Sequence, residues 1–412
     1  MILMTEQIKK SLYSIFAWYF RTIAKCLMVR HKPTIIAITG TVGKTTTKDI
    51  IVAALRTRYG TDETRAVESV RGTIRSQNSD LTTPLSILGF ELNNGERSIT
   101  LWLGYAFGAF KALFAKKFPY YLVLEVGAGK PDDVRSQAQW LKPNICVFTA
   151  LSETPVHVEF FESVQQVYEE KKQLALFSAL DATLIYPEDD QLLMDLLSDT
   201  KRTLMPVSMD RSITLHGVVG EAYARSYGLA IEVCRLLDID EHTVQEHIDR
   251  YFDPAPGRMR LLKGINDSRI LDDSYNASPI AVENALNELR ILSQANSGRA
   301  LFLFGDMKEL GMYSEEAHGM VGKQILDNGI DMFVAVGEES EYAVRSAIES
   351  GYNSENIHQF HNAEQAGKWL STQLQKSDLL LAKGSRHSIH LESALKHIVI
   401  PEDVPKLVQE YL

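Results

Sequence analysis

The sequence has few cysteines, no excess of basic residues, and no internal repeat or low-complexity tract. Its three cysteines, Cys26, Cys146 and Cys234, lie far apart and form no CxxC pair. Metal–thiolate and disulfide frameworks are therefore disfavoured, and a reducing cytoplasm fits. The formal net charge of −10 argues against general nucleic-acid binding, which usually requires a basic excess. The net charge does not exclude binding of a small anionic substrate, because a local basic pocket can lie inside an acidic surface.

The N-terminal region lacks an apolar run long enough to cross a bilayer. Residues 12–20 are apolar, as in a signal peptide, but Arg21 and Lys25 interrupt the run and no small-residue cleavage site follows. We expect residues 5–29 to form one helix that packs on the body of the protein, with docking on a membrane surface as the alternative. A second apolar, aromatic-rich stretch, residues 101–114, is either a buried core helix or an exposed helix that contacts a membrane or a partner protein. The predicted location is the cytoplasm, at the inner face of the membrane if either helix docks there.

The chain of 412 residues is long enough for two or three domains. From residue 34 to about residue 252, apolar β-branched runs alternate with helical patterns, which predicts an α/β domain with a mainly parallel sheet. Two prolines and a glycine at residues 254–257 end this pattern, and a second, smaller α/β pattern of the Rossmann type follows. The predicted units are an N-terminal helix over residues 1–32, a central domain over 33–253 and a C-terminal domain over 254–412.

A phosphate-binding loop is predicted between the first strand and the first helix of the central domain. The apolar run of residues 34–38 leads into Gly40-Thr41-Val42-Gly43-Lys44-Thr45-Thr46-Thr47, which opens an amphipathic helix. A strand, a glycine turn and a helix N-terminus together place backbone N–H groups against one point, where a phosphate binds. The glycines permit the turn, the lysine would reach the terminal phosphates, and the hydroxyl after it suits Mg²⁺. The first glycine of the usual P-loop pattern is absent here, because that position is Ile38.

Side chains that could bind a metal ion lie at the ends of two further strands of the central domain. Glu125 ends the strand of residues 121–126 and precedes a Gly-Ala-Gly turn, where a carboxylate can hold Mg²⁺ against the phosphates. His157 follows the strand of residues 145–149 and is either a second metal ligand or a structural histidine. Ligands of open α/β sheets gather at these carboxyl ends of the strands.

The C-terminal domain has three polar stretches at predicted strand ends or at the domain junction. Arg258 lies in Pro-Gly-Arg at the junction, where it would clamp a phosphate when the domains close. The stretch 272–279 contains Asp273 and Asn276, in a turn suited to hydrogen-bonding a ribose or base. Lys383 and Arg386 follow the last strand and could dock an anionic substrate.

Together these stretches resemble the Mur ligase family, the ATP-dependent amide-forming enzymes of peptidoglycan synthesis. The match covers about residues 33–395 in the family's order, and the member that adds D-alanyl-D-alanine to a UDP-muramyl-tripeptide is the most similar. Its motifs here are the phosphate loop, Asn78 before Thr83-Pro84-Leu85, Leu124-Glu125-Val126-Gly127-Ala128, His157-Val158-Glu159-Phe160-Phe161 with Lys171, Pro256-Gly257-Arg258, Asp272-Asp273-Ser274-Tyr275-Asn276-Ala277, Gly305-Asp306-Met307-Lys308-Glu309-Leu310-Gly311 and Lys383-Gly384-Ser385-Arg386.

The resemblance implies roles for individual residues. One Mg²⁺ would be held by Thr45 and Glu125, and a second ion by His157 and a carbamylated Lys171. ATP would be bound by residues of the loop, by Arg258 and by Asp273. The implied catalytic set is Lys44, Glu125, His157 and Lys171; the implied ATP-binding set is Gly40, Thr41, Gly43, Lys44, Thr45, Thr46, Arg258 and Asp273; the substrate set is Asn78, Asn276, Lys383 and Arg386.

The implied activity is an ATP-dependent ligase that joins a muramyl-peptide or related acidic acceptor to an amino-acid or dipeptide donor through an acyl phosphate. Alternatives are a polyglutamate-type ligase and a catalytically silent nucleotide-binding scaffold. The sequence also departs from the family pattern, because only about 32 residues precede the first strand, where the family has a domain for the UDP-sugar. Either another protein presents the substrate, or the N-terminal helix and nearby loops hold it differently, or the substrate is not a UDP-muramyl peptide. A further departure is Ala222, Tyr223 and Ser226, where the family has His, Asn and Asn.

Overall fold

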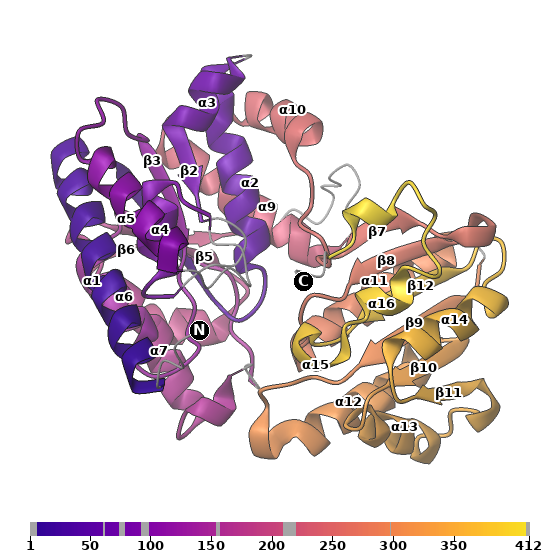
Figure 1. Ribbon diagram of the computed structural model, residues 1–412. Coiled ribbons are helices and arrows are strands. Elements are labelled where there is room, and N and C mark those ends of the chain that lie inside the picture. The colour runs from indigo at the N-terminus through magenta and orange to yellow at the C-terminus, as the bar shows by residue number, and fades with distance from the viewer. Residues whose placement is uncertain are drawn as a thin grey trace.

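The structure is a computed structural model that describes residues 6–60, 62–73, 79–91, 99–153, 157–208, 220–296 and 298–408. Two α/β units lie side by side, and each is built around a six-stranded sheet (Figure 1). The predicted fold class, a central domain with a parallel sheet and a smaller Rossmann-like C-terminal domain, is confirmed. Asn78 lies outside the described residues.

The first sheet is parallel throughout and has the order β2-β3-β1-β4-β5-β6. Its central strand β1 consists almost entirely of β-branched and small apolar residues, as a strand buried on both faces requires. The strands are β1 (Thr34–Thr39), β2 (Val70–Gly72), β3 (Tyr121–Glu125), β4 (Ile145–Phe148), β5 (Thr183–Pro187) and β6 (Thr203–Val207).

Helices cover both faces of this sheet. Ile36 and Ile38 of β1 point to one face, in the cluster that includes α2, α9 and α10, whereas Ile35 and Ala37 point to the other. The helices of this half are α1 (Glu6–His31), α2 (Lys44–Arg56), α3 (Glu63–Ser69), α4 (Thr82–Leu88), α5 (Ile99–Ala112), α6 (Asp133–Leu141), α7 (Val164–Leu176), α8 (Gln191–Leu197), α9 (Glu221–Leu236) and α10 (Glu241–Tyr251).

The second sheet has the order β11-β10-β9-β12-β8-β7, in which only β7 pairs antiparallel among the described strands. Its strands are β7 (Arg260–Lys263), β8 (Arg269–Asp273), β9 (Ala300–Gly305), β10 (Met332–Val336), β11 (Ile357–Phe360) and β12 (Leu379–Lys383). Its helices are α11 (Pro279–Asn296), α12 (Ser314–Asp327), α13 (Ser340–Glu349), α14 (Ala363–Gln373), α15 (Arg386–Ile389) and α16 (Glu392–Leu395).

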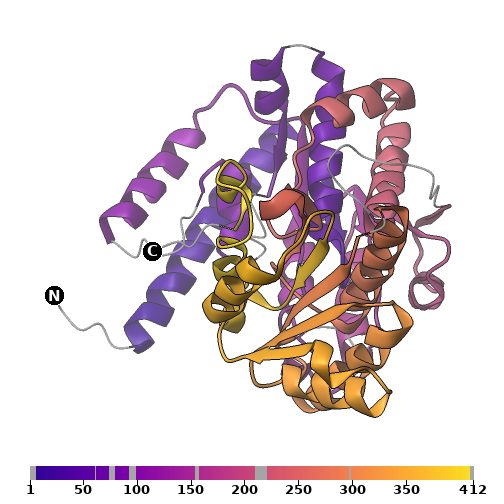
Figure 2. The same cartoon turned by 90° about the vertical axis from the view of Figure 1, so that its right-hand side faces the viewer.

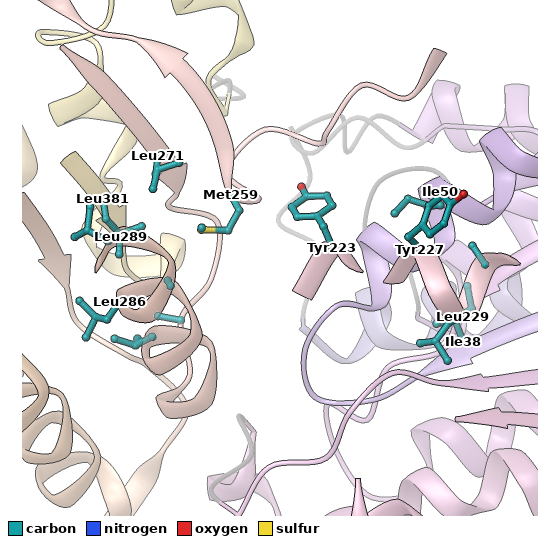
Figure 3. Packing of buried hydrophobic residues seen from close by; sticks show 14 of the residues in the cluster. Ile38, Ile50, Tyr223, Tyr227, Leu229, Met259, Leu271, Leu286, Leu289 and Leu381 are labelled. Carbon is teal, nitrogen blue, oxygen red and sulfur yellow. The ribbon is translucent and has the colours of Figure 1, made fainter. Parts of the chain in front are cut away.

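One buried hydrophobic cluster extends from the first sheet to the second. It runs from Ile38 and Ile50 through Tyr223 and Tyr227 on α9 to Met259 at the junction, and on to α11 and β12 (Figure 3). Apolar packing therefore fixes how the carboxyl ends of the two sheets face each other, and the site described below lies where they meet.

The N-terminal helix α1 packs on the central domain, as predicted. Its buried residues, among them Phe20 and Leu27, join the cluster on the face of the sheet opposite α2. Helices α1 and α5 lie on the side of the molecule away from the C-terminal domain (Figures 1 and 2). Helix α5 is neither wholly core nor wholly exposed, because Ala109 is buried whereas Phe107 is exposed. Within the described part of the chain, no helix has the length and apolar character needed to cross a bilayer.

Candidate active site

The predicted phosphate loop lies between β1 and α2 and is drawn tightly against the end of β4. Gly40 has φ +146° and Gly43, which precedes the first residue of α2, has φ +85°. A Cβ added to Gly40 would lie 2.1 Å from Thr149 Oγ1, so only glycine fits at that position. Thr149 in turn donates a hydrogen bond to the carbonyl of Val42. Contacts with the residue that follows the neighbouring strand β4 therefore hold the loop in place.

Two lysines converge on one carbonyl of this loop. Lys44 Nζ donates to Gly40 O at 2.9 Å and to Thr41 O at 3.3 Å, and Lys171 Nζ from α7 donates to the same Gly40 O at 3.0 Å. Burial lowers the pKa of Lys44, Glu125 opposes that shift, and Arg258 adds to it. The two amines lie where the phosphates of a nucleotide would bind, and Lys44 in its protonated form would offset their charge.

Lys171 is nearly fully buried, with 4 % of its surface exposed. Burial lowers its pKa well below the ordinary lysine value, the neighbouring Lys44 adds to this, and Glu170 opposes it. Glu170 itself accepts hydrogen bonds from Val134 N at 2.7 Å and Arg135 N at 3.0 Å in the first turn of α6, which fixes this part of α7. A buried lysine with a depressed pKa has a neutral amine available, the form that reacts with CO₂ to give a carbamate.

Thr45 and Glu125 lie together, as predicted from the motif positions. Thr45 Oγ1 donates to Glu125 Oε2 at 2.9 Å, and both side chains are buried. Thr41 Oγ1 is also buried and, among the described residues, has no hydrogen-bond partner in the protein. Hard oxygen donors beside an unsatisfied hydroxyl suit Mg²⁺ and a phosphate oxygen, so these residues fit one magnesium–nucleotide complex.

His157 lies at the same cavity but contacts the C-terminal domain. Its Nδ1 is 2.5 Å from Glu309 Oε2, and each side chain is about one-third exposed. Both residues have positive φ, 69° for His157 and 65° for Glu309. Among the described residues, no group of three His, Cys, Asp or Glu side chains is arranged to hold a metal ion. A second ion would therefore depend on a carbamate at Lys171 and on His157 leaving Glu309.

The C-terminal domain contributes a second set of polar groups. Arg258 lies over the ring of Tyr275, with its Cζ 4.3 Å from the ring centroid. Asp273 accepts from Met259 N at 3.2 Å and from Lys383 Nζ. Lys383, predicted to dock an anionic substrate, is 2 % exposed, and it also donates to Asn276 O at 3.1 Å. Its amine thus orders the turn that carries Asp273 and Asn276.

These groups border one cavity of about 470 Å³ between the two domains. The fold brings nearly all of the predicted site residues of both domains to this one cavity. Arg386 does not line this cavity; it pairs with the buried Glu392 at 3.4 Å. The predicted residues that line the cavity are Gly40, Thr41, Gly43, Lys44, Thr45, Thr46, Glu125, His157, Lys171, Arg258, Asp273, Asn276 and Lys383.

The cavity also has residues that sequence reasoning missed as site residues. Tyr13 of α1 lines it, together with Ser79, Asp80 and Lys130. Tyr223 lines it as well, where the family pattern has asparagine, and its hydroxyl donates to Arg258 O. Tyr13 had no motif to mark it, whereas the departure at Tyr223 was visible in the sequence.

Comparison with known protein families identifies both halves of the chain. The family model described as Mur ligase middle domain matches residues 38–245, and the model described as Mur ligase, glutamate ligase domain matches residues 257–386. The first begins just before the phosphate loop and the second at the Arg258 junction, so together they contain every predicted site residue that lines the cavity.

Relatives and solved structures with this arrangement extend over most of the chain. The UDP-N-acetylmuramoyl-tripeptide–D-alanyl-D-alanine ligase of Bacillus subtilis (strain 168) is 23 % identical over 409 residues, covering 92 % of this chain and 78 % of that protein. The crystal structure of MurF from Acinetobacter baumannii has a TM-score of 0.71 at 20 % identity, covering 94 % of this chain and 80 % of the other. MurF ligase from Thermotoga maritima in complex with ADP has a TM-score of 0.69 at 21 % identity, covering 93 % and 83 %. The two family matches, which begin at the phosphate loop and at the domain junction, establish that this chain belongs to the Mur ligase family of ATP-dependent, amide-bond-forming ligases.

Proposed function

We propose that this enzyme adds D-alanyl-D-alanine to a muramyl tripeptide in peptidoglycan synthesis, with ATP as the second substrate. The observation that carries the proposal is the convergence, in one interdomain cavity, of the phosphate loop, the Thr45–Glu125 pair and the buried Lys171 with Arg258 and Asp273 of the C-terminal domain. The similarity to the Bacillus subtilis ligase, whose name specifies these substrates, supports the choice of acceptor and donor.

The reaction has two steps. A carboxylate oxygen of the acceptor attacks the γ-phosphorus of ATP, the bond to the β-phosphate oxygen breaks, and ADP and an acyl phosphate result. The donor amine then attacks the acyl carbon, the bond to the phosphate oxygen breaks, and phosphate leaves as the amide forms and the amine loses its proton.

The chain's own residues serve the first step chiefly by positioning and by charge. Lys44, whose amine lies over the loop carbonyls, would neutralise the transferring phosphoryl group. Thr45 and Glu125 would hold Mg²⁺, which offsets charge on the phosphate oxygens when bound. Arg258, stacked on Tyr275, and Asp273 would orient the nucleotide from the opposite domain. Asn276 lines the same cavity and would contact substrate. Asn78 stays proposed as a substrate contact from its motif alone, and Arg386 would contact substrate only after leaving Glu392.

We further propose that Lys171 is carbamylated and, with His157, completes a second Mg²⁺ site. Burial lowers the pKa of Lys171 and so raises the neutral fraction of its amine, whose nitrogen can attack CO₂, form an N–C bond and release a proton. The resulting carbamate is an anionic oxygen donor. Mass spectrometry of protein kept in bicarbonate should find one added CO₂ on the peptide that contains Lys171, and an unmodified amine under these conditions would contradict this part of the proposal.

For location, we propose the cytoplasm, with contact at the inner face of the membrane through the N-terminal helix or residues 101–114. Both acidic and basic side chains line the cavity, rather than basic ones alone, and we propose no nucleic-acid partner.

The test is a turnover assay with defined substrates. Purified enzyme, ATP and Mg²⁺ are supplied with UDP-muramyl-tripeptide and D-alanyl-D-alanine; phosphate release and the new amide are measured together. We expect phosphate release that requires both substrates and matches product in amount. Turnover only with a glutamyl acceptor and glutamate would identify a polyglutamate-type ligase instead. No substrate-dependent turnover with either pair would indicate a nucleotide-binding scaffold.

A further inference from the structure

Helix α5 exposes a continuous apolar stripe to solvent. Leu103, Phe107, Phe110 and Phe114 are 60 %, 60 %, 50 % and 69 % exposed. Spacings of four and three residues place the first three on one side of the helix, and Phe114 follows in the turn after its last residue. We refer to these four residues as the α5 stripe. Large apolar side chains that gather in this way on a surface mark a contact site more often than single exposed residues do.

The opposite side of α5 is held firmly by α1. The rings of Phe16 and Trp102 lie 5.3 Å apart, Tyr19 donates to Ala106 O at 2.9 Å, and Arg30 donates to Leu113 O at 2.8 Å. These contacts hold α5 in place through its other face. The stripe is therefore presented in a fixed orientation, on a helix that lies on the side of the molecule away from the C-terminal domain (Figure 1). Figure 2 shows the same helix after a quarter turn.

The charged residues of α5 and of the segment that follows it are all lysines. Residues 99–118 contain three lysines and no Asp or Glu, although the whole chain has a net charge of −10. Lys111 Nζ lies 4.5 Å from the centroid of the Phe107 ring, so its stem follows the apolar surface and its charge lies at the margin. Lys116 is exposed just beyond the helix, and Lys117 pairs with Glu68 of α3 at 2.8 Å. Aromatic residues bordered by lysines are typical of a helix that lies in the interface of an anionic membrane.

A bilayer surface fits this patch better than a second copy of the chain does. In a self-complementary contact the same lysines of both copies would converge, and α5 supplies no acidic residue to offset them. An anionic leaflet, by contrast, attracts the lysines while the aromatic rings enter the boundary of the acyl region. The helix has 14 residues, which is too short to span the hydrocarbon core, so it would lie along the surface.

We propose that the α5 stripe docks this enzyme on an anionic lipid bilayer, with Lys111 and Lys116 against the headgroups. This inference deepens the proposed location and rests on it, but it does not depend on the proposed ligase reaction. Neither the residues of the α5 stripe nor the two lysines line the interdomain cavity, so membrane contact and substrate binding use different residues.

The test is co-sedimentation of the full chain with phosphatidylcholine vesicles, with and without phosphatidylglycerol. We expect binding to the anionic vesicles and much weaker binding to the neutral ones. Phe107→Ser with Phe110→Ser should weaken binding by about tenfold per phenylalanine, because each ring loses most of its transfer free energy. Lys111→Gln with Lys116→Gln should weaken binding by about fivefold per lysine, and only on anionic vesicles.

Matched controls remove similar residues elsewhere. Leu180→Ser with Ile348→Ser deletes exposed apolar side chains outside the stripe, and Lys323→Gln deletes an exposed lysine; neither should change vesicle binding. Turnover with soluble substrates should be unchanged in the stripe variants, which shows that they fold and separates this proposal from the ligase proposal. Absence of vesicle binding by the unmodified protein would overturn the inference. So would a stripe substitution that shifts the sedimentation coefficient from dimer to monomer, because the stripe would then be covered by a second copy.

Discussion

Replacement of Lys171 by methionine tests whether this buried amine takes part in the reaction or only supports the structure. Methionine preserves most of the side-chain volume, so the substitution opens little cavity in α7. It removes one hydrogen bond to Gly40 O, but Lys44 still donates to that carbonyl at 2.9 Å, so the acceptor is not left unsatisfied. We therefore expect the free energy of unfolding to change by less than about 1 kcal/mol.

The effect on turnover should be much larger than the effect on stability. If Lys171 carries a carbamate that holds an ion against the transferring phosphoryl group, its loss should lower kcat by about 100-fold or more, the range seen when one preorganised charge-stabilising group is removed. Added bicarbonate should raise turnover of enzyme prepared without CO₂ and leave the Lys171→Met variant unchanged. The assay is substrate-dependent phosphate release, with urea denaturation alongside it.

The neighbouring lysine provides the matched control for this experiment. Lys172 lies on the same helix and pairs with the exposed Asp199 at 2.8 Å, away from the loop. Lys172→Met should keep kcat within about twofold of the unmodified enzyme, because Lys172 does not line the cavity. If Lys171→Met retained similar kcat, or if bicarbonate had no effect on enzyme prepared without CO₂, the chemical role of Lys171 would be refuted.

Three further predictions follow from the loop and the junction. Lys44→Ala should abolish phosphate release while leaving the urea midpoint nearly unchanged; a variant that unfolds instead would show that the lysine is mainly structural. Gly40→Ala should lower the free energy of unfolding by about 2–4 kcal/mol, since its Cβ would meet Thr149 Oγ1 at 2.1 Å and its φ is +146°. The control Gly43→Ala, with φ +85° but no contact shorter than 3.6 Å, should cost about 1–2 kcal/mol, and equal losses at both positions would contradict the steric argument. Burial raises the pKa of Asp272 to about 6, so the folded protein binds an extra proton between about pH 4 and pH 6 and loses about 3 kcal/mol of stability as pH rises through that range. Asp272→Asn lacks this pH-dependent loss, so its free energy of unfolding relative to that of the unmodified protein should rise between pH 4 and pH 7. If urea unfolding gave the same difference between the two proteins at every pH, the assignment would be refuted.

The phosphate loop and the strand-end residues could be predicted from the sequence because both depend on local patterns. A continuous β-branched run followed by glycines and Lys44 specifies strand, turn and helix within about fifteen residues. Glu125 was placed correctly beside Thr45 because parallel strands bring their carboxyl ends to one edge of a sheet. The three-residue edge strand β2, in contrast, has no apolar run of its own and gains its structure from pairing with β3.

Contacts between distant segments were decided by the tertiary structure. The pairing of His157 with Glu309 joins two domains, and neither residue's position in its motif indicates the other. The pairing of Lys383 with Asp273 gives a buried cation a structural partner that strand order alone did not reveal. Likewise, composition made residues 101–114 apolar, but packing on α1 decided which side of that helix is buried. The sequence determined the chemistry available at each strand end, because that chemistry depends on residue type and local turns. Only the docking of domains and helices determined which of those groups meet, because it depends on side-chain packing over the whole chain.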